Sequence, residues 1–148
     1  MSLPYENASS GKSAIDDMAK LLRVFGASSF GTMEDFAAGK VIVQFEHRGR
    51  RVSIEASFWG YAAAWKRAHP YTSRSRRDRG RYEALALKRG EVAVWSILRD
   101  WLKGQLTAIE VGMQSFESAF LAQLTLPTGE TVMQRLVESK QLMLQGYN

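Results

Sequence analysis

The stretch KVIVQFEHRGRRVSIEAS, residues 40–57, decides the centre of the fold, because two alternating runs flank a short turn that contains glycine. If Arg48 and Gly49 form a two-residue hairpin loop, one side of the hairpin is apolar and the other is polar. In this pairing register the side chains on both faces of the hairpin are matched. This agreement is stronger evidence for a hairpin than the strand propensity of either run. The predicted pairs are Val41 with Ala56, Val43 with Ile54, Gln44 with Ser53, Phe45 with Val52, Glu46 with Arg51 and His47 with Arg50.

The segments on either side of this hairpin read as further secondary structure. Serines that favour a helix start and an apolar pattern at helical spacing predict a helix over about residues 13–25, which ends at Gly26. A short strand over residues 29–34 is predicted to precede the hairpin. After the hairpin, Ser57 is expected to cap a short helix that ends before Pro70.

A long amphipathic pattern dominates the second half of the chain. It runs over residues 82–109 and predicts one long helix that Gly112 ends or bends. A Pro-Thr-Gly turn then precedes a predicted final helix over about residues 131–140. The expected fold is α+β in a single domain, 1–148: a helix, a three-stranded antiparallel sheet, and then helices that include one long amphipathic helix.

Composition excludes several classes of protein. The chain has 148 residues, of which 45% are hydrophobic, which suits one packed core. It has no cysteine, so disulfides, thiolate metal sites and cysteine nucleophiles are excluded. No apolar run approaches the roughly 20 residues that span a bilayer, and the first residues lack the pattern of a signal peptide. We therefore expect a cytoplasmic protein without a membrane partner.

Positive charge is concentrated in one quarter of the chain. The net charge is +5, but residues 47–81 alone contain ten lysines and arginines against two acids, a net of +8. The rest of the chain is therefore net −3. Such a concentration produces a focused field, and an anionic polymer is the first partner to consider.

Two groups of cations carry this charge, one at the hairpin tip and one in the connection around residues 70–81. The helix predicted between them is about 18 Å long, so we expect the two groups to converge on one side of the molecule. Tyr71 and Tyr82 flank the arginines outside any evident apolar stripe, where their rings are expected to stack on bases. The alternative is a solvated charged loop. The candidate nucleic-acid-binding residues are Arg48, Arg50, Arg51, Lys66, Arg67, Tyr71, Arg74, Arg76, Arg77, Arg79, Arg81 and Tyr82.

Motifs for catalysis are incomplete. Residues 11–13, Gly-Lys-Ser, reproduce the end of a phosphate-binding loop, but Glu6 stands where that motif needs a glycine, so a helix cap is the simpler interpretation. Asp35 and Glu55 are candidate metal ligands of a nuclease, although Ser57 stands where its lysine belongs. The two histidines lie at no recognisable ligand spacing. We expect no metal, no cofactor and no catalytic residue.

Two resemblances extend this reading. The order helix, three strands, helix over residues 13–69 is similar to the double-stranded-RNA-binding domain, but SFWGYAAAWKRA lacks the lysines that begin the second helix in that family. The segments VQFEHRGRRVSIEAS, GYAAAW and SILRDWLKGQLTAIEVG resemble parts of small uncharacterised proteins encoded by bacteriophages and prophages. This second resemblance implies the host cytoplasm, and a replication or recombination accessory or an inhibitor of host or defence enzymes.

The sequence therefore favours a non-catalytic nucleic-acid-binding accessory protein that contacts the phosphate backbone of DNA or RNA through arginines. The alternative is a protein that inhibits or recruits a host or phage enzyme, with the tail over residues 142–148 contributing to the contact. A metal-dependent nuclease is a third, weaker hypothesis. A homodimer is also expected, because the long helix with Trp95 and Trp101 has more apolar surface than one small sheet covers.

Overall fold

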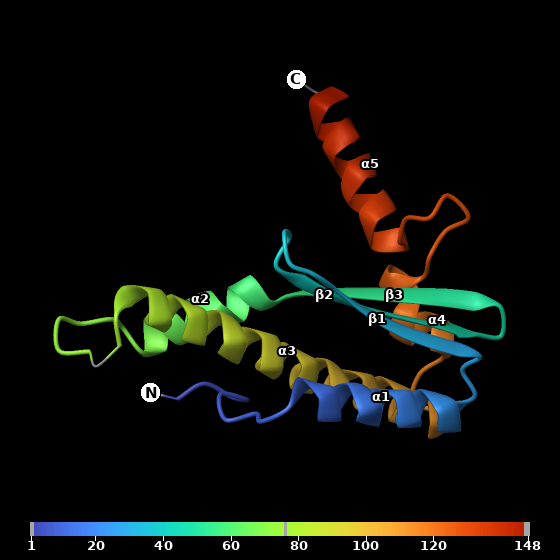
Figure 1. Cartoon of the computed structure of the whole chain (residues 1–148). Helices are drawn as coiled ribbons and strands as arrows, with labels where there is room; N and C mark the ends of the chain where they lie inside the picture. The colour runs from blue at the N-terminus through green and yellow to red at the C-terminus, as the bar shows by residue number, and fades with distance from the viewer. Residues whose placement is uncertain (1, 76, 147–148) are drawn as a thin grey trace.

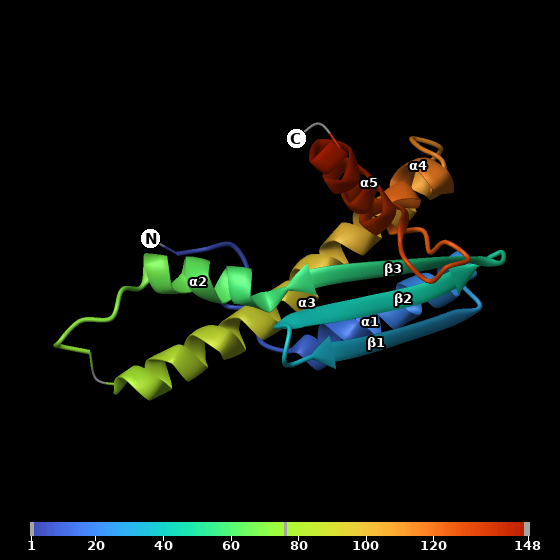
Figure 2. The ribbon, with the colours of Figure 1, turned by 90° about the horizontal axis from the view of Figure 1, so that it is seen from above.

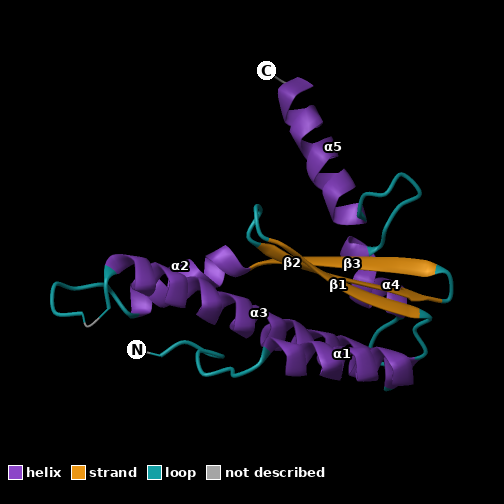
Figure 3. Cartoon of the chain, viewed as in Figure 1, coloured by secondary structure: helices purple, strands orange, loops and turns teal. Residues whose placement is uncertain are grey.

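The protein is an α+β fold, as the sequence predicts (Figures 1 and 3). The computed structural model describes the backbone of residues 2–75 and 77–146, and the side chains of these ranges up to residue 140. The helices and strands are α1 (Gly11–Phe25), β1 (Ser29–Asp35), β2 (Lys40–His47), β3 (Arg50–Ser57), α2 (Phe58–Ala68), α3 (Arg79–Glu110), α4 (Phe116–Phe120), the 3₁₀ turn η1 (Leu121–Gln123) and α5 (Val132–Gly146).

The three strands form one antiparallel sheet in the order β1-β2-β3. The register predicted for the β2–β3 hairpin is confirmed at every pair, from Val41 opposite Ala56 to His47 opposite Arg50. Its turn has Arg48 at φ 51° and Gly49 at φ 79°. Two consecutive positive φ angles are what a tight hairpin loop requires, and they match the right-handed twist of the strands.

One face of the sheet packs on α1 and α3, which lie together on the same side of it (Figure 1). The alternation of β2 and β3 places their apolar side chains on this face, and α1 and α3 add residues at helical spacing. Phe120 of α4 closes the end of the core near the hairpin tip, with its ring 5.4 Å from that of Phe45. The buried residues of this main core are Ala14, Met18, Leu22, Val41, Val43, Phe45, Val52, Ile54, Phe58, Val94, Trp95, Leu98, Leu102, Leu106 and Phe120.

Local caps set the ends of α1 and α2. Ser10 caps α1 by accepting a hydrogen bond from the Ser13 amide at 3.1 Å, so the helix begins two residues earlier than predicted. Gly26 ends it in the left-handed conformation, at φ 102°, as predicted. The Gly-Lys-Ser stretch is thus the first turn of a capped helix. Ser57 caps α2 as predicted, accepting from the Gly60 amide.

The helix α2 packs along the first half of α3, beyond the end of the sheet (Figure 2). The two helices approach closely at Gly90, which is buried. A Cβ atom at this position would lie 2.5 Å from the carbonyl oxygen of Phe58 and 3.1 Å from the amide nitrogen of Ala62. Both neighbours are backbone atoms of α2, so the close packing of α2 on α3 requires glycine here.

The C-terminal part of the chain covers the β3 edge and then leaves the body. Isolated bridges join Val52 to Leu124 and Thr125 to Thr131. The helix α5 follows and projects from the side of the sheet opposite α1 and α3 (Figure 1). Thr131 and Gln134 form a reciprocal cap at its start, with each backbone N–H donating to the other side chain. The helix continues to Gly146, beyond the predicted end.

The apolar surface of α3 is used within the chain. Trp95 is buried in the main core, and Trp101 packs edge-on against Phe120 with ring centroids 5.9 Å apart. Trp95 is thus covered within the chain and Trp101 is half-buried against Phe120, so these two tryptophans do not support the homodimer, which stays a prediction. Among the described residues, no helix combines the length and hydrophobicity needed to cross a membrane.

Two of the glycines of α3, at positions 90 and 104, predict opposite effects of the same change. Gly90→Ala forces a methyl group into the backbone of α2, and we expect a loss of about 2 kcal/mol in the free energy of unfolding. Gly104→Ala is the matched control, since nothing lies within 4 Å of its would-be Cβ atom. It should stabilise the protein by up to about 1 kcal/mol through helix propensity. Urea unfolding measures both, and equal effects would contradict this account.

Candidate nucleic-acid interface

The two groups of cations predicted to converge lie at opposite ends of the molecule. The β2–β3 turn with Arg48 is at one extreme and the α2–α3 connection is at the other, both in Figure 1 and after the rotation in Figure 2. The prediction of a single cationic surface is therefore wrong. That prediction took the distance between the two groups as the length of the intervening helix alone.

The chain travels further than that between the two groups. From the hairpin tip it first runs back along all eight residues of β3, which span about 27 Å. The eleven residues of α2 then continue in the same direction for about 16 Å (Figure 2). The strand and the helix add instead of folding back, which separates the groups by about 40 Å.

The arginines at the hairpin tip are mostly engaged with the protein itself. Arg50 forms an ion pair with Glu117 of α4. Arg51 lies 3.9 Å from Glu46 on the neighbouring strand. Arg48 occupies the turn and is exposed. One of the three tip arginines is therefore without a carboxylate partner among the described residues, and the tip is a weak anion site.

The other group is far less neutralised. We use the name arginine-rich end for the last turn of α2, the connection over residues 69–78 and the first turn of α3. From Lys66 to Glu83 the sequence carries seven lysines and arginines against two acids, a net of +5. The structure describes Lys66, Arg67, Arg74, Arg77, Arg79 and Arg81 of this set, and Arg76 lies outside the described residues.

Ion pairs in the arginine-rich end hold half of the described cations. Lys66 pairs with Glu83 at 2.8 Å, and Arg79 reaches the same carboxylate at 3.7 Å. Arg81 lies 3.7 Å from Asp78. The exposed Arg67, Arg74 and Arg77 pair with no carboxylate among the described side chains. With three described cations unpaired against one at the hairpin tip, this end keeps more of its positive field than the tip does.

The position of the connection is fixed at both of its ends. The hydroxyl of Tyr82, on α3, donates to the carbonyl oxygen of His69 at 2.7 Å and lies 3.2 Å from that of Lys66. Asp78 caps α3 by accepting from the Arg81 amide at 2.7 Å. This cap starts α3 three residues earlier than the apolar pattern indicates. The arginines thus extend from a braced helix pair.

The two tyrosines do not present free rings to a ligand. Tyr82 is 7% exposed and packs against Trp65 in a second, smaller core, so its predicted role in base stacking is wrong. Tyr71 is half-buried, with its ring 5.2 Å from that of Tyr82. The guanidinium carbon of Arg79 lies 5.1 Å from the Tyr71 ring centroid. Both rings support the connection.

The sequence contained a signal for the burial of Tyr82. Stepping back by four residues from Val94 along α3 reaches Gly90, Ala86 and Tyr82, and all four are buried. The apolar stripe of the long helix therefore continues through small residues to Tyr82. Glycine and alanine do not look like core residues in a hydropathy pattern, so in the sequence the apolar stripe is evident only from Val94 onward.

Sequence reasoning also missed the N-terminal segment, which packs against this end. Pro4 accepts a hydrogen bond from the Tyr61 hydroxyl at 2.6 Å. Glu6 pairs with His69, and its carbonyl oxygen accepts from Arg89 at 3.2 Å. No periodicity or motif marks such irregular contacts. Their consequence is that His69 is occupied by a carboxylate and is a poor phosphate ligand.

The two candidate nuclease carboxylates have structural partners. Asp35 accepts from the Ala38 amide at 3.0 Å and so stabilises the β1–β2 turn. Glu55 pairs with Lys40 at 3.1 Å. Within the described parts of the chain, no group of three or more histidines or acids is placed to hold a metal ion. This arrangement favours no metal-dependent reaction at Asp35 and Glu55.

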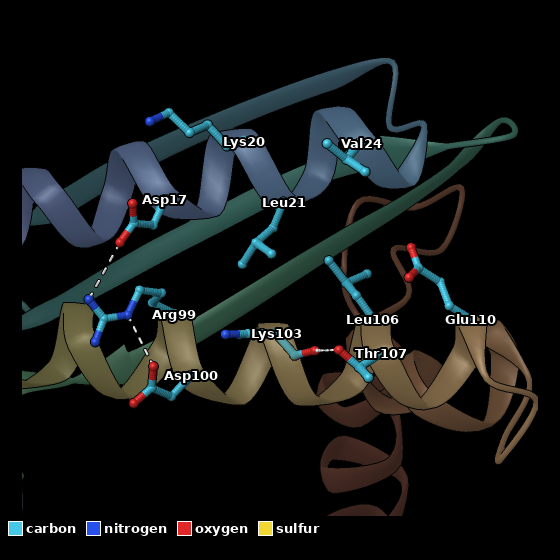
Figure 4. Close-up of a pocket in the computed structure, with 10 residues that line it drawn as sticks. All are labelled: Asp17, Lys20, Leu21, Val24, Arg99, Asp100, Lys103, Leu106, Thr107 and Glu110. Atoms are coloured by element: carbon cyan, nitrogen blue, oxygen red, sulfur yellow. Dashed lines mark hydrogen bonds and ion pairs between the residues drawn. The ribbon is translucent and has the colours of Figure 1, made fainter.

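A groove of about 580 Å³ lies between α1 and α3 (Figure 4). Arg99 lies at one end of it, between Asp17 at 3.6 Å and Asp100 at 3.0 Å. The Tyr5 hydroxyl donates to Asp100 at 2.6 Å, and this hydrogen bond holds the pKa of Asp100 below its ordinary value. Leu21 lines the middle of the groove. These charges satisfy one another, and none of them stands as a base beside a nucleophile.

A pair of carboxyl groups joins β1 to α3. Burial raises the pKa of Glu91, and the neighbouring Glu34 carboxylate raises it further. The indole N–H of Trp95 is directed at Glu34, with a donor–acceptor distance of 3.4 Å. Lys88 lies near and acts in the opposite direction on the pKa of Glu91. This contact makes the stability of the fold depend on pH.

Comparisons with known proteins give no match, whether to a protein-family model, to a curated protein or to a solved structure. The resemblances to phage-encoded proteins and to the double-stranded-RNA-binding domain therefore stay predictions. The case for a function rests on the geometry of the arginine-rich end.

Glu91→Gln should stabilise the protein at neutral pH. The folded chain holds the Glu91 proton more tightly than the unfolded chain, so its contribution is most favourable at acid pH and is lost as the pH rises through the raised pKa. An amide removes the repulsion from Glu34. We expect a gain of about 0.5 kcal/mol at pH 7 that disappears near pH 4, measured by urea unfolding. Glu110→Gln, an exposed glutamate of the same helix, is the control, and an equal pH dependence there would contradict this reading.

Proposed function

We propose that the protein binds nucleic acid through its phosphate backbone with the arginine-rich end, and that it catalyses no reaction on it. The observation that carries this proposal is the exposure of Arg67, Arg74 and Arg77 without a carboxylate partner among the described residues. The hairpin tip is left out, because it lies at the far end and two of its three arginines are paired.

Arginine is suited to this role. Its planar guanidinium group donates two parallel hydrogen bonds to a phosphate and stays charged at every physiological pH. A chain segment that served only for solubility would mix charges of both signs, whereas this one has a net charge of +5 between Lys66 and Glu83. Electrostatic attraction to a polyanion requires no cavity, which fits a connection that lies at one extremity of the molecule (Figure 2).

The arrangement supports binding without sequence readout. The described cations lie on a short connection and on the last and first turns of two helices, and not along the length of one helix that could enter a groove and read base edges. In the setting that the resemblance to phage-encoded proteins implies, the protein is an accessory of replication or recombination in the host cytoplasm.

A second candidate function is binding to another protein, and α5 is the feature that favours it. This helix projects from the body and exposes Met133, Leu136 and Val137 by 51%, 59% and 47%. Isolated helices of about 15 residues are only marginally stable in water, so an apolar partner would stabilise α5. A second copy of the chain or a host or phage enzyme are the two candidates, and the tail that the sequence favoured for this contact lies outside the described side chains.

Charge reversal at the two ends tests the nucleic-acid proposal. Arg74→Glu with Arg77→Glu removes two phosphate contacts, so we expect at least a tenfold loss of affinity at 0.1 M salt and a salt slope reduced by about 2. Arg48→Glu with Arg51→Glu changes the net charge equally at the other end and should keep affinity within about threefold. Fluorescence anisotropy with a labelled 20-base-pair duplex measures both. Equal losses in the two variants would reject the arginine-rich end as the site.

Replacement of the exposed residues of α5 tests the second function. Leu136→Glu with Val137→Glu should abolish any self-association seen by sedimentation velocity, because it places two charges in the apolar contact. Met133 is left intact so that the helix start is unchanged. Met113→Glu, which alters an exposed methionine in the loop after α3, is the control. If the wild type is a monomer and captures no protein from nuclease-treated lysate, the second function is rejected.

A further inference from the structure

We infer that the arginine-rich end binds the backbone of duplex nucleic acid, DNA or RNA, in preference to single strands. This inference rests on the proposed function and names the ligand class of the same site. It follows from three properties of the site: its aromatic rings are buried or partly covered, the backbone that carries its cations is anchored in advance, and its interaction is almost purely electrostatic.

The first property is the absence of a stacking surface among the described residues of this end. Proteins that hold single strands gain about 1–3 kcal/mol for each base stacked on an aromatic ring. Here Tyr82 is buried, and Tyr71 is half-buried, with the Tyr82 ring at 5.2 Å and the Arg79 guanidinium carbon 5.1 Å from its ring centroid. Tyr82 thus offers no face to a base, and a base would have to displace Arg79 to reach the Tyr71 face that the guanidinium covers.

Three aromatic rings of the described residues are exposed elsewhere, and one of them, Tyr5, has its hydroxyl bonded to Asp100 in the second half of α3, away from the cations. Phe36 lies in the β1–β2 turn, and Trp59 packs against Gly39 of the same turn, in the first turn of α2. Both are therefore at the sheet end of α2, whereas the cations are at its other end. A strand bound at the arginines would have to run the length of α2, about 16 Å, to reach them.

The second property is that the backbone that carries the cations is anchored before binding. The Tyr82 hydroxyl bonds to the backbone at Lys66 and His69, and Asp78 caps α3 between the arginines. Within the connection, the Thr72 amide donates to the Ser75 hydroxyl at 3.0 Å. Duplex phosphates are also fixed in space, so an anchored backbone meets a rigid array, whereas a flexible single strand loses conformational entropy when it is ordered.

The third property sets the size of the preference. Neutralising one phosphate contributes about 0.9 to the salt slope on duplex DNA and about 0.7 on a single strand. For about four contacts the two salt slopes differ by about 0.8. If the duplex and the single strand bind equally at about 1 M salt, this difference makes the duplex bind about sixfold more tightly at 0.1 M. A site with stacking rings would reverse this order.

The test compares three labelled ligands on the whole protein: a 20-base-pair DNA duplex, an RNA duplex of the same sequence, and a 20-nucleotide oligothymidylate that forms no structure. Anisotropy titrations at 50, 100 and 200 mM salt give affinities and slopes. We expect the duplexes to bind at least fivefold more tightly than the single strand at 100 mM, with the steeper slope. The two duplex arms show whether B-form or A-form geometry suits the cations better.

Tyr71→Leu tests the covered ring directly, with Tyr82→Phe as a second variant that keeps both rings but removes the hydroxyl anchor. Tyr71→Leu should leave both affinities within about twofold, and Tyr82→Phe should reduce the duplex preference by loosening the connection. Circular dichroism confirms folding of each. A single strand that binds as tightly as the duplex, or that loses most of its affinity in Tyr71→Leu, overturns the inference.

Failure of the inference differs visibly from failure of the proposed function. If no nucleic acid binds at 50 mM salt, or if binding ignores charge reversal of Arg74 and Arg77, the function itself is rejected. If binding depends on these arginines but favours the single strand, the function stands and only the duplex preference is rejected. The wild-type comparison decides this without any variant.

Discussion

The apolar stripe of α3 is the constraint on which the rest of the structure depends. This one helix of 32 residues spans about 48 Å and contributes to both cores. Its second half, from Val94 to Leu106, packs against the sheet and α1. Its first half, from Tyr82 to Gly90, packs against α2. Because the same rigid element belongs to both, the arginine-rich end is held at a fixed distance from the sheet.

Local patterns were enough to predict the hairpin, β1 and the helices α1, α2, α3 and α5, but not the short helix α4. The register of β2 and β3 follows from side-chain alternation and a two-residue turn, and both are properties of neighbouring residues. The helix ends follow from the caps at Ser10, Ser57 and Gly26 for the same reason. The direction in which α2 leaves β3 is different. It depends on where α2 finds a partner, and that partner is Gly90, about thirty residues further along the chain.

The candidate site shows the same division. The residue types of a phosphate-binding end were visible in the sequence, since charge concentration needs no tertiary information. The extent of the site was not visible in the sequence. Arg50 is paired with Glu117 of a distant helix, and Tyr82 packs against Trp65, and neither contact can be predicted from neighbouring residues. A count of arginines in the sequence therefore overestimates the number of residues that can bind a ligand. Burial and ion pairing decide which of them are free to do so.

The separation of the arginines from the main core has a consequence for how the protein tolerates change. Arg67, Arg74 and Arg77 are exposed and belong to neither core, so their replacement creates no cavity. The residues that position them are instead small or buried, namely Gly90, Ala86 and Tyr82. Variation at the cations thus alters the electrostatic field at constant stability, while variation along the α3 stripe alters both. In this fold the side chains that would attract a polyanion and those that place them are different residues, joined through one helix.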